Sequence, residues 1–325
     1  MDIMDIFNSD PWNRVDMVEA INVAPGVPTR IGQMGLFNGG RGTTTPDIGI
    51  QVNQKGHLLI QTAARGSDPE YNHSDPKELR LIRAPHLPQK DAVMADELIA
   101  AYNSGSMDQT VNDKLEDMRV NHDLTHEWHM LNALRGKVLD ADGTSTVYDW
   151  YDFFGLTRRS INLGAVGGVY QMCEELKRQV TKSLGFQVFG GITVLVEETG
   201  FRNIIRDAQV LQDYNRLDMS AHARTNHAFN SVTLYGVTFE EYSGYFNDTT
   251  PFVEANRGYA FPTSSMFYKR YNAPAPQTSS VGTRGVPFYM TKKLLDHEAG
   301  IEIKTNTNPL FVCERPESLV ELVLG

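Results

Sequence analysis

Residues 121–143 read NHDLTHEWHMLNALRGKVLDADG, and they predict where a long helix ends and a hairpin begins. Gly136 stands at a position where a glycine commonly ends a helix. The following residues predict two strands that turn at Asp142-Gly143. The apolar residues before Gly136 have the three-or-four spacing of one helical face: Leu124, Trp128, Leu131 and Leu134.

The same spacing continues toward the N-terminus, through Met107, Val111, Leu115 and Met118. Neither proline nor glycine interrupts the chain between Gly105 and Gly136. The pattern predicts a helix over residues 104–135, which at 1.5 Å per residue is about 45 Å long. A helix of that length is expected to be the main structural support of its domain.

Three histidines, His122, His126 and His129, lie in the second half of this helix. At about 100° per residue they share one helical face, and imidazole is a common zinc ligand. The spacing differs from the zinc-protease signature, because His126-Glu127-Trp128-His129 places the second histidine one position early. We therefore favour histidines that are partly buried or line a contact with another chain. A zinc site stays open as the alternative.

Composition limits the class of protein. The 325 residues are 41% hydrophobic and carry a formal net charge of −10, which argues against a protein that grips nucleic-acid phosphates. Cys173 and Cys313 match no zinc or redox spacing and are expected to be reduced, buried thiols. The N-terminus lacks the charge and apolar core of a signal peptide, and no run has the length of a membrane-spanning helix. The sequence predicts an intracellular, soluble chain.

Residues 1–45 combine helix-breaking and apolar residues. Pro25, Pro28 and repeated glycines are expected to block regular structure, yet Val27, Ile31, Met34, Leu36 and Phe37 are too apolar for a free linker. An extended apolar segment needs a surface to lie on, either in its own chain or in a neighbour.

Residues 46–88 predict a projecting hairpin. DIGIQVN alternates strictly, and HLLIQTA follows after a turn at Gln54-Lys55-Gly56. A polar loop then leads to the returning segment LRLIRAPHLP. Two long arms with little core of their own are typical of a lid or of an interaction device.

The rest of the chain predicts mixed α+β structure, without the regular alternation of a dinucleotide-binding fold. A helix is expected at 168–184, strands within 186–198, and a second helix at 199–215 with Ile204, Ile205, Ala208 and Leu211 inward. Residues 230–246 and the C-terminal segment read as strands.

Searches for catalytic motifs find no nucleophile elbow, phosphate-binding lysine loop or dinucleotide glycine motif. The acid pairs Glu197-Glu198 and Glu240-Glu241 are expected on solvated faces. The sequence thus predicts no catalytic residue, no cofactor and no metal site.

Four segments in order resemble the major capsid protein E family of tailed bacteriophages, of the lambda type. They are DIFNSDPWNRVDMVEAINVAPGVPTRIGQMGLF at 5–37, RAPHLPQKDAVMADEL at 83–98, NHDLTHEWHMLNALRGKVLDADG at 121–143 and TNPLFVCERPESLVEL at 307–322. The resemblance implies the Hong Kong ninety-seven capsid fold. Its expected parts are an N-terminal arm (1–45), an extended hairpin loop (46–88), a peripheral domain (89–163) with a spine helix (104–135), an axial domain (164–290), and C-terminal strands returning to the peripheral domain (291–325).

The resemblance also implies a function: a major capsid protein whose hexamers and pentamers form an icosahedral shell around packaged double-stranded DNA. The expected location is the virion, after assembly in the host cytoplasm. Scaffolding, portal and decoration proteins are the expected partners, with a separate scaffolding protein because the arm starts almost at Met1. Neither a membrane nor a specific DNA sequence is expected to be bound. The alternatives are an encapsulin-like cargo shell and a zinc-dependent hydrolase that uses His122, His126 and His129.

Contacts between subunits are expected at three kinds of residue. They are the apolar residues of the arm and the hairpin loop, selected charged residues of the loop, and residues near the end of the long helix. The candidates are Val27, Ile31, Leu36, Phe37, Ile48, Ile50, Lys55, Leu58, Ile60, Arg65, Arg83, His122, His126, Trp128 and His129.

Overall fold

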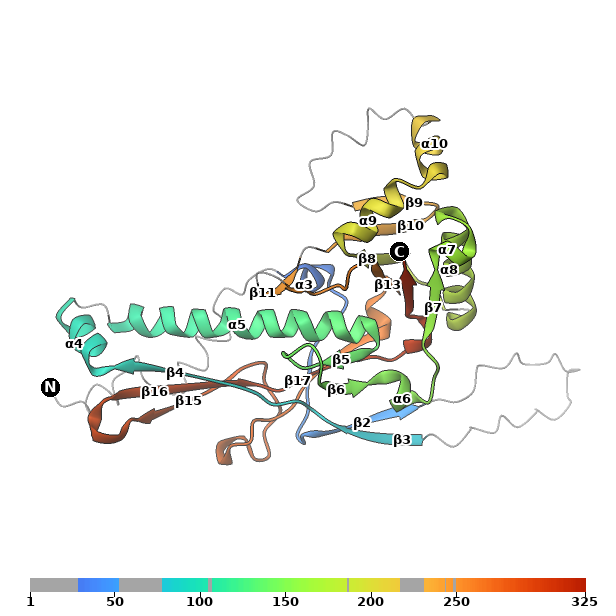
Figure 1. The fold of residues 1–325 in the computed structure, drawn as a ribbon. Helices are drawn as coiled ribbons and strands as arrows, with labels where there is room; N and C mark the ends of the chain where they lie inside the picture. Colours follow the sequence, from blue (N-terminus) through green and yellow to red (C-terminus); the bar gives the residue numbers. More distant parts are fainter. Residues whose placement is uncertain are drawn as a thin grey trace, which may run out of the picture.

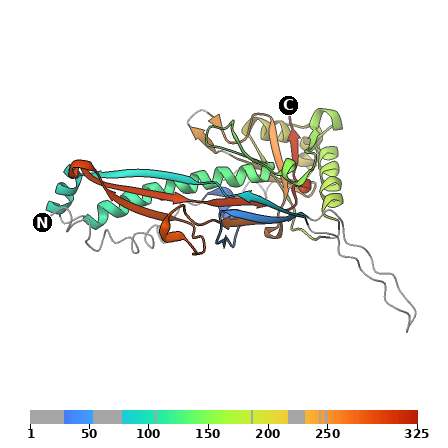
Figure 2. The same ribbon diagram turned by 90° about the horizontal axis from the view of Figure 1, so that it is seen from below.

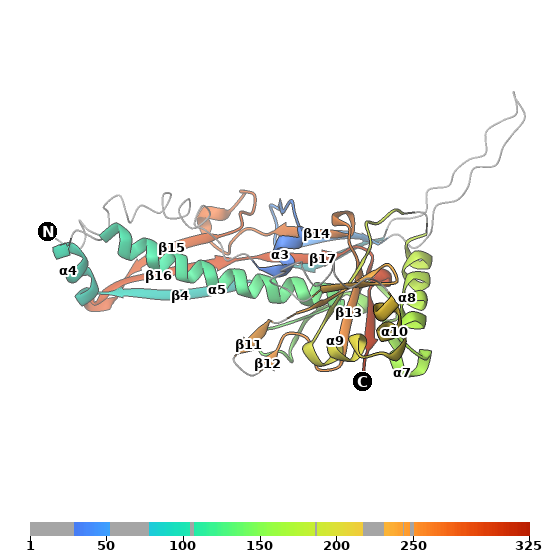
Figure 3. The same cartoon turned by 90° about the horizontal axis from the view of Figure 1, so that it is seen from above.

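The computed structural model describes residues 29–52, 78–104, 107–185, 187–216, 231–242, 244–247 and 250–325. A long helix and a narrow sheet run side by side along one half of the molecule, and a wider sheet flanked by helices forms the other half (Figures 1, 2 and 3). The described chain is elongated, and the predicted mixture of helices and strands is confirmed.

The long helix is α5, Met107–Arg135. It is preceded by a separate helix, α4, Ala95–Ser104. The prediction of one helix from 104 to 135 is confirmed apart from its first residues. Gly136 ends α5 with a φ of +78°, and a Cβ there would lie 2.3 Å from the Tyr151 ring. The predicted hairpin follows as β5, Lys137–Leu139, and β6, Thr146–Asp149.

The two halves of α5 pack into two different cores. Val111, Leu115 and Met118 belong to a small core, whose other members include Ile301 and Ile303. The following turns contribute Trp128, Leu131 and Leu134 to the main core. One rigid helix therefore connects both halves of the molecule.

A three-stranded antiparallel sheet covers the first half of α5. Its strands, in spatial order, are β15, Tyr289–Leu294, β16, Gly300–Thr307, and β4, Leu87–Met94. The β16–β4 register runs from Gly300 opposite Met94 to Thr307 opposite Leu87, so the C-terminal region completes the sheet that the N-terminal region begins.

The base of the projecting hairpin is a two-stranded ribbon. β2, Asp47–Val52, pairs along its whole length with β3, Glu78–Arg83, from Asp47 opposite Arg83 to Val52 opposite Glu78. The strand that was expected to pair with β2 at a close turn, residues 57–63, lies outside the described residues. The returning segment, by contrast, forms β3 as the sequence predicts.

A six-stranded mixed sheet forms the wide half of the molecule. In spatial order its strands are β7 (Arg159–Asn162), β18 (Val320–Val323), β13 (Arg257–Pro262), β8 (Ile192–Val196), β10 (Val237–Glu241) and β9 (Ser231–Leu234). The last strand of the chain thus lies inside this sheet, whereas the final strands were expected to return to the long helix.

Short helices and strands complete the fold. They are α3 (Arg30–Met34), α6 (Trp150–Phe154), α7 (Leu163–Val166), α8 (Val169–Leu184), β1 (Arg41–Gly42), β11 (Tyr245–Asn247), β12 (Thr250–Pro251), β14 (Tyr268–Asn272) and β17 (Pro309–Cys313). The helix predicted at 168–184 is confirmed as α8. Strands β1, β14 and β17 form a small sheet in the centre of the molecule.

The predicted helix at 199–215 is wrong as a single element. Two helices form instead, α9 (Glu198–Ile205) and α10 (Ala208–Arg216). Asp207 breaks the run because its carboxylate accepts hydrogen bonds from the amides of Gln209 (3.0 Å) and Val210 (3.3 Å) and so starts a new helix. The new helix has a new inward face: Val210 is buried, while Ala208 and Leu211, expected inward, are exposed. In α9, Ile204 is buried as expected, but Ile205 is exposed.

Residues 30–34 correct the expectation that prolines and glycines block regular structure throughout the arm, since they form helix α3. Gly35 ends this helix in the left-handed conformation, with a φ of +65°. Ile31, Leu36 and Phe37 are buried in the core of their own chain. The surface that this segment needs is therefore intramolecular.

Both cysteines are buried and unpaired, as predicted. Burial raises the pKa of the Cys173 thiol to about 12, so the thiolate is scarce at neutral pH. None of the helices in the described part of the chain combines the length and the hydropathy needed to cross a bilayer.

Candidate functional site

The three histidines of α5 lie in the interior, with 4%, 4% and 2% of the surface of His122, His126 and His129 exposed. The His122 Nε2 atom lies 3.0 Å from the Thr305 hydroxyl, and the His126 Nε2 atom lies 3.1 Å from the Thr307 hydroxyl. Both threonines are buried on β16. Because Thr305 and Thr307 are two residues apart on one strand, they meet side chains that are one helical turn apart. The pairs fix the position of α5 on β16.

Aromatic rings enclose two of these histidines. The Phe288 ring centroid lies 5.9 Å from that of His122 and 5.7 Å from that of His126, and Phe311 contacts His126 at 5.9 Å. The Arg119 guanidinium lies 4.0 Å from the Phe288 centroid. This apolar surrounding disfavours an additional positive charge on either imidazole.

Burial, together with the nearby Arg119 charge, lowers the pKa of His122 to about 4. Burial likewise lowers the pKa of His129 to about 4, although Asp140 acts in the opposite direction. The pKa of His126 is held well below its usual value, chiefly by burial. All three imidazoles are therefore neutral at pH 7.

The zinc interpretation of these histidines is not supported. Within the described ranges, no group of three histidine, cysteine, aspartate or glutamate side chains converges as a metal site requires. The His122 and His126 ring centroids are 6.5 Å apart, and each ring has a threonine hydroxyl at hydrogen-bond distance. The packing of α5 against β16 accounts for the positions of both.

Glu127, between these histidines, forms the centre of a junction. Its side chain is buried, and its Oε1 atom accepts hydrogen bonds from the Ile31 amide at 2.8 Å and from the Tyr242 hydroxyl at 2.9 Å. Its Oε2 atom accepts from the Gly32 amide at 3.3 Å. One carboxylate thus connects α3, α5 and the residue that follows β10.

An ion pair between Arg30 and Glu240 reinforces this junction. The Arg30 Nη2 atom donates to Glu240 Oε2 at 2.6 Å, and its Nε atom contacts the other oxygen. The bond to Glu240 raises the pKa of Arg30. Glu240 is buried, which corrects the expectation of a solvated face for the pair Glu240-Glu241. The reason is that β10 lies within the sheet between β8 and β9, and the Arg30 side chain covers the Glu240 carboxylate.

The ribbon of β2 and β3 has one buried face and one open face. Ile48 and Ile50 are buried, while Leu79 and Leu81 are 60% and 68% exposed on the opposite side of the ribbon. Arg83 continues the open face at the end of β3. We call Leu79, Leu81 and Arg83 the ribbon face. Two adjacent exposed leucines on a strand are typical of a surface that contacts a partner.

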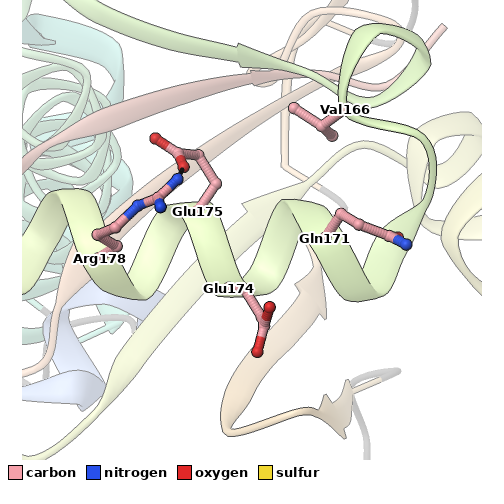
Figure 4. Close-up of a pocket in the computed structure, with 5 residues that line it drawn as sticks. All are labelled: Val166, Gln171, Glu174, Glu175 and Arg178. Carbon is pink, nitrogen blue, oxygen red and sulfur yellow. Dashed lines mark hydrogen bonds and ion pairs between the residues drawn. The ribbon is translucent and has the colours of Figure 1, made fainter.

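A hollow of about 500 Å³ lies against α8 and the end of α7, lined by Val166, Gln171, Glu174, Glu175 and Arg178. Figure 4 shows Glu175 and Arg178 directed toward each other, with Glu174 pointing away from both. The Tyr170 hydroxyl donates to Glu174 at 2.9 Å. Since both acids are partnered along their own helix, the hollow is a charged surface rather than a catalytic pocket.

The predicted contact residues fall into three groups. Nine are buried within this one chain: Ile31, Leu36, Phe37, Ile48, Ile50, His122, His126, Trp128 and His129. Arg83 is exposed. The remaining five, Val27, Lys55, Leu58, Ile60 and Arg65, lie outside the described residues. The structure brings Phe37 and His126 together at the Phe311 ring.

The sequence reasoning missed Arg30, Glu127, Glu240 and Tyr242 as a connected group. Glu127 was noted only as a neighbour of the histidines. A usable signal was present, because Glu127 is flanked by residues of an apolar helical face and a carboxylate there needs a partner. The identity of that partner depends on contacts across 96 residues to Ile31 and 115 residues to Tyr242.

The comparisons with known proteins identify the family. The family model for phage major capsid protein E matches residues 13–324. The chain belongs to the phage major capsid protein E family. It is a structural component of a phage virion, as the resemblance implied.

Relatives and a solved structure agree with this assignment. The chain is 24% identical over 351 residues to the major capsid protein of Salmonella phage Felix O1 (isolate Felix O1-VT1), covering 94% of this chain and 95% of that protein. It is 23% identical over 334 residues to that of Pseudomonas phage KPP10, with the same coverage. The crystal structure of a protein assigned as the capsid protein of an E. coli CFT073 prophage matches with a TM-score of 0.58 at 13% identity, covering 96% of this chain and 99% of that one. The predicted capsid fold is confirmed.

Family membership also decides between the interpretations. It favours a phage head protein over an encapsulin-like cargo shell and over a zinc-dependent hydrolase. In a capsid protein, the functional site is the set of contacts that shape the subunit and join it to its neighbours. The junction at Glu127 belongs to the first kind, and the ribbon face has the exposure that the second kind requires.

Proposed function

We propose that this major capsid protein forms hexamers and pentamers, which close into an icosahedral shell around packaged double-stranded DNA. The match to the phage major capsid protein E family over residues 13–324 is the observation that carries this proposal. Many copies of a weak contact stabilise a shell, because each copy buries apolar surface only after it meets its neighbours.

The proposed parts are the arm (1–45), the hairpin loop (46–88), the peripheral domain (89–163) and the axial domain (164–290), with residues 291–325 returning toward the peripheral domain. The pairing of β4 with β16 supports a peripheral unit that includes the returning strands. The pairing of β18 with β13 and β7 supports one refinement, which assigns residues 320–325 to the axial unit.

The ribbon face is the proposed assembly contact among the described residues. Leu79 and Leu81 expose apolar surface that a neighbouring subunit would bury, and Arg83 adds a charge beside it. Val27, Lys55, Leu58, Ile60 and Arg65 remain proposed contacts. The nine buried candidates contribute indirectly, because they fix the shape of the subunit that presents the ribbon face.

The partners proposed are a separate scaffolding protein, a portal and a decoration protein. DNA is proposed to be enclosed without sequence-specific binding, which the net charge of −10 supports because a strongly basic wall would retain phosphates. No enzymatic activity and no cofactor are part of the proposed function.

The experiment is expression with and without the neighbouring scaffolding gene, followed by negative-stain electron microscopy. Closed shells, or rings of five and six subunits, are the expected products. A uniform monomer or dimer under both conditions would contradict the proposal.

A matched pair of variants tests the ribbon face. The double variant Leu79→Lys/Leu81→Lys should yield folded subunits that fail to form shells. The control Val188→Lys changes a side chain that is 85% exposed elsewhere and should assemble normally. Normal shells from the double variant would exclude the ribbon face as an assembly contact.

A further inference from the structure

One face of the three-stranded sheet of β15, β16 and β4 is turned away from α5. Ile303 of β16 packs in the small core beneath α5, and side chains alternate along a strand, so Glu302 and Lys304 point to the opposite face. Lys304 lies directly opposite Lys90 of β4. Glu302 lies directly opposite Lys293 of β15, so all four side chains share this face. We call Lys90, Lys293 and Lys304 the lysine face.

The lysine face carries more positive than negative charge. Its acid, Glu302, pairs with Lys90, whose ammonium nitrogen lies 3.3 Å and 3.4 Å from the two carboxylate oxygens. Within the described ranges, neither Lys293 nor Lys304 forms an ion pair or a side-chain hydrogen bond. Three ammonium groups against one carboxylate leave an excess of two positive charges.

Two of these lysines are arranged at a cost to the isolated subunit. Lys90 and Lys304 face each other across an antiparallel pair, where like charges are destabilising. The acids of the turn between β15 and β16, Asp296 and Glu298, do not compensate, because Lys304 lies four residues along β16 from Gly300, which is about 14 Å. Charges at that separation are largely screened at physiological salt. An anion that approaches both lysines would remove this cost.

The helix side of the same half has the opposite charge. Asp113, Glu116 and Asp117 are exposed on α5. At about 100° per residue they lie on the side of the helix opposite Leu115, which is buried in the small core. This half is thus two layers thick, with acids on the helix side and the lysine face on the sheet side (Figure 1). Of the two sides, the sheet side is the one that attracts a polyanion.

We propose that the lysine face contacts the phosphate backbone of the packaged double-stranded DNA. This inference rests on the proposed function, which places DNA against one side of the shell wall. A lysine ammonium group binds phosphate as a point charge and carries no sequence information. The contact therefore agrees with DNA that is enclosed without sequence-specific binding, and the acidic helix side faces away from the DNA.

The contact is weak in each subunit. Binding of three lysines to phosphates gives an affinity whose logarithm falls with the logarithm of the salt concentration, with a slope of about −2.7. The positive excess is confined to this face of a chain whose net charge is −10. The wall therefore holds DNA at many separate points that each release readily, and it does not retain phosphates as a strongly basic wall would.

Lysine reactivity tests the proposal. DNA-filled heads, and the same heads after release of their DNA, are acetylated at low salt with a water-soluble N-hydroxysuccinimide ester, and each lysine is read by mass spectrometry. The lysine face should react several-fold more slowly in filled heads than in emptied ones. Lys182, exposed on α8, is the control and should react at the same rate in both.

Salt distinguishes contact with DNA from slow entry of the reagent. A tenfold rise in salt weakens three phosphate contacts about 500-fold, so protection in filled heads should be lost. Protection that does not respond to salt would overturn the proposal, and so would equal reactivity in filled and emptied heads. Protection that persists after DNA release would also reject DNA as the occupant, and would identify an acidic surface of a neighbouring protein instead.

The variant Lys304→Gln gives a second test, because it removes the like-charge pair. Free subunits should unfold at a midpoint on the order of 1 °C higher. In filled heads, Lys90 and Lys293 should lose their protection at lower salt than in wild type. Lys182→Gln is the control and should change neither result. A salt dependence that Lys304→Gln leaves unchanged would overturn the proposal.

Electron microscopy of the same preparations separates this inference from the proposed function. If no DNA-filled heads form, the proposed function itself fails. If filled heads form and their lysine face reacts as fast as that of emptied heads, only the contact with DNA is rejected.

Discussion

The Tyr242 hydroxyl, directly after β10, donates a 2.9 Å hydrogen bond to the carboxylate of Glu127 in α5. The same carboxylate accepts the amides of Ile31 and Gly32, so the six-stranded sheet, the long helix and α3 meet at one buried group. A displacement of the sheet relative to α5 must lengthen or break these bonds. The Glu127 carboxylate therefore fixes the position of one half of the subunit relative to the other.

Glu127→Gln is expected to lower the free energy of unfolding of free subunits by about 1–3 kcal/mol. The hydrogen bonds to a charged carboxylate are then replaced by weaker bonds to a neutral oxygen. In addition, one carboxylate oxygen is replaced by an NH₂ group, a donor that faces a donating backbone amide. Denaturant titration measures the loss. Glu116→Gln, at an exposed position of the same helix, is the control and should change stability by less than about 0.5 kcal/mol. Equal stabilities of the two variants would show that the junction carries no net energy.

The Arg30–Glu240 pair is expected to show strong coupling. The Glu240 side chain is 3% exposed, so Arg30→Met should leave an unpaired buried carboxylate and cost more than the double variant Arg30→Met/Glu240→Gln. A double-mutant cycle on the free energy of unfolding should give a coupling of about 1–3 kcal/mol. If the losses of the two single variants add up to the loss of the double variant, water replaces the Arg30 side chain at Glu240 without a cost in stability.

Acid is expected to destabilise the subunit through the buried histidines. The folded-state pKa of His122 is about 4, below its unfolded value of about 6.5, so the unfolded chain binds protons first. Stability is therefore complete above about pH 6.5 and falls as the pH decreases toward 4. Arg119 and Arg270 near the histidines oppose protonation, whereas Asp140 favours it at His129.

His122→Gln keeps a polar contact for Thr305 but cannot titrate. Between pH 7 and pH 5 it should lose less stability than wild type, by on the order of 1–2 kcal/mol. The exposed His297 supplies the control, and His297→Gln should follow the wild-type profile. Parallel profiles for all three proteins would assign the acid sensitivity to other groups.

Phe37→Ala is expected to destabilise free subunits by about 3–5 kcal/mol, because the ring is buried against Tyr268 (5.3 Å between centroids) and Phe311 (5.4 Å). Tyr245→Ala, at a 50% exposed side chain, is the control with little expected change. Thermal unfolding of free subunits measures both. A small loss for Phe37→Ala would mean that this segment is ordered only by neighbours in the shell.

Elements with strong local patterns could be predicted from the sequence. The helix that ends before Gly136 and α8, which ends before Gly185, each have apolar residues at helical spacing and a glycine after the last turn. The hairpin between them has its turn at Gly143. The break at Asp207 was missed because the apolar period continues across it, and only the capping bonds of Asp207 reveal the second helix. Local patterns thus specify elements better than the faces that those elements bury.

The contacts of the candidate site could be predicted only in part. Burial of His122 and His126 follows from their position on the helical face that begins with Val111, Leu115 and Met118, all of which are buried. Their threonine partners lie 183 and 181 residues away, and no local rule selects a strand at that separation. Glu240 was misjudged for a related reason. It lies on the polar side of β10, where Thr238 and Glu240 alternate with Val237 and Phe239, and the Arg30 side chain that covers Glu240 comes from 210 residues away.

The last strand of the sheet, β18, lies between β7 and β13 and comes from residues 320–323. During synthesis, β7 and β13 emerge from the ribosome long before the strand that separates them. Until β18 is synthesised, the edges of β7 and β13 that it covers stay open and can pair with other chains. A chain that stops before residue 320 lacks the strand that joins β7 to the rest of the sheet. Such a chain is expected to be excluded from a shell, because it cannot complete the sheet of its own subunit.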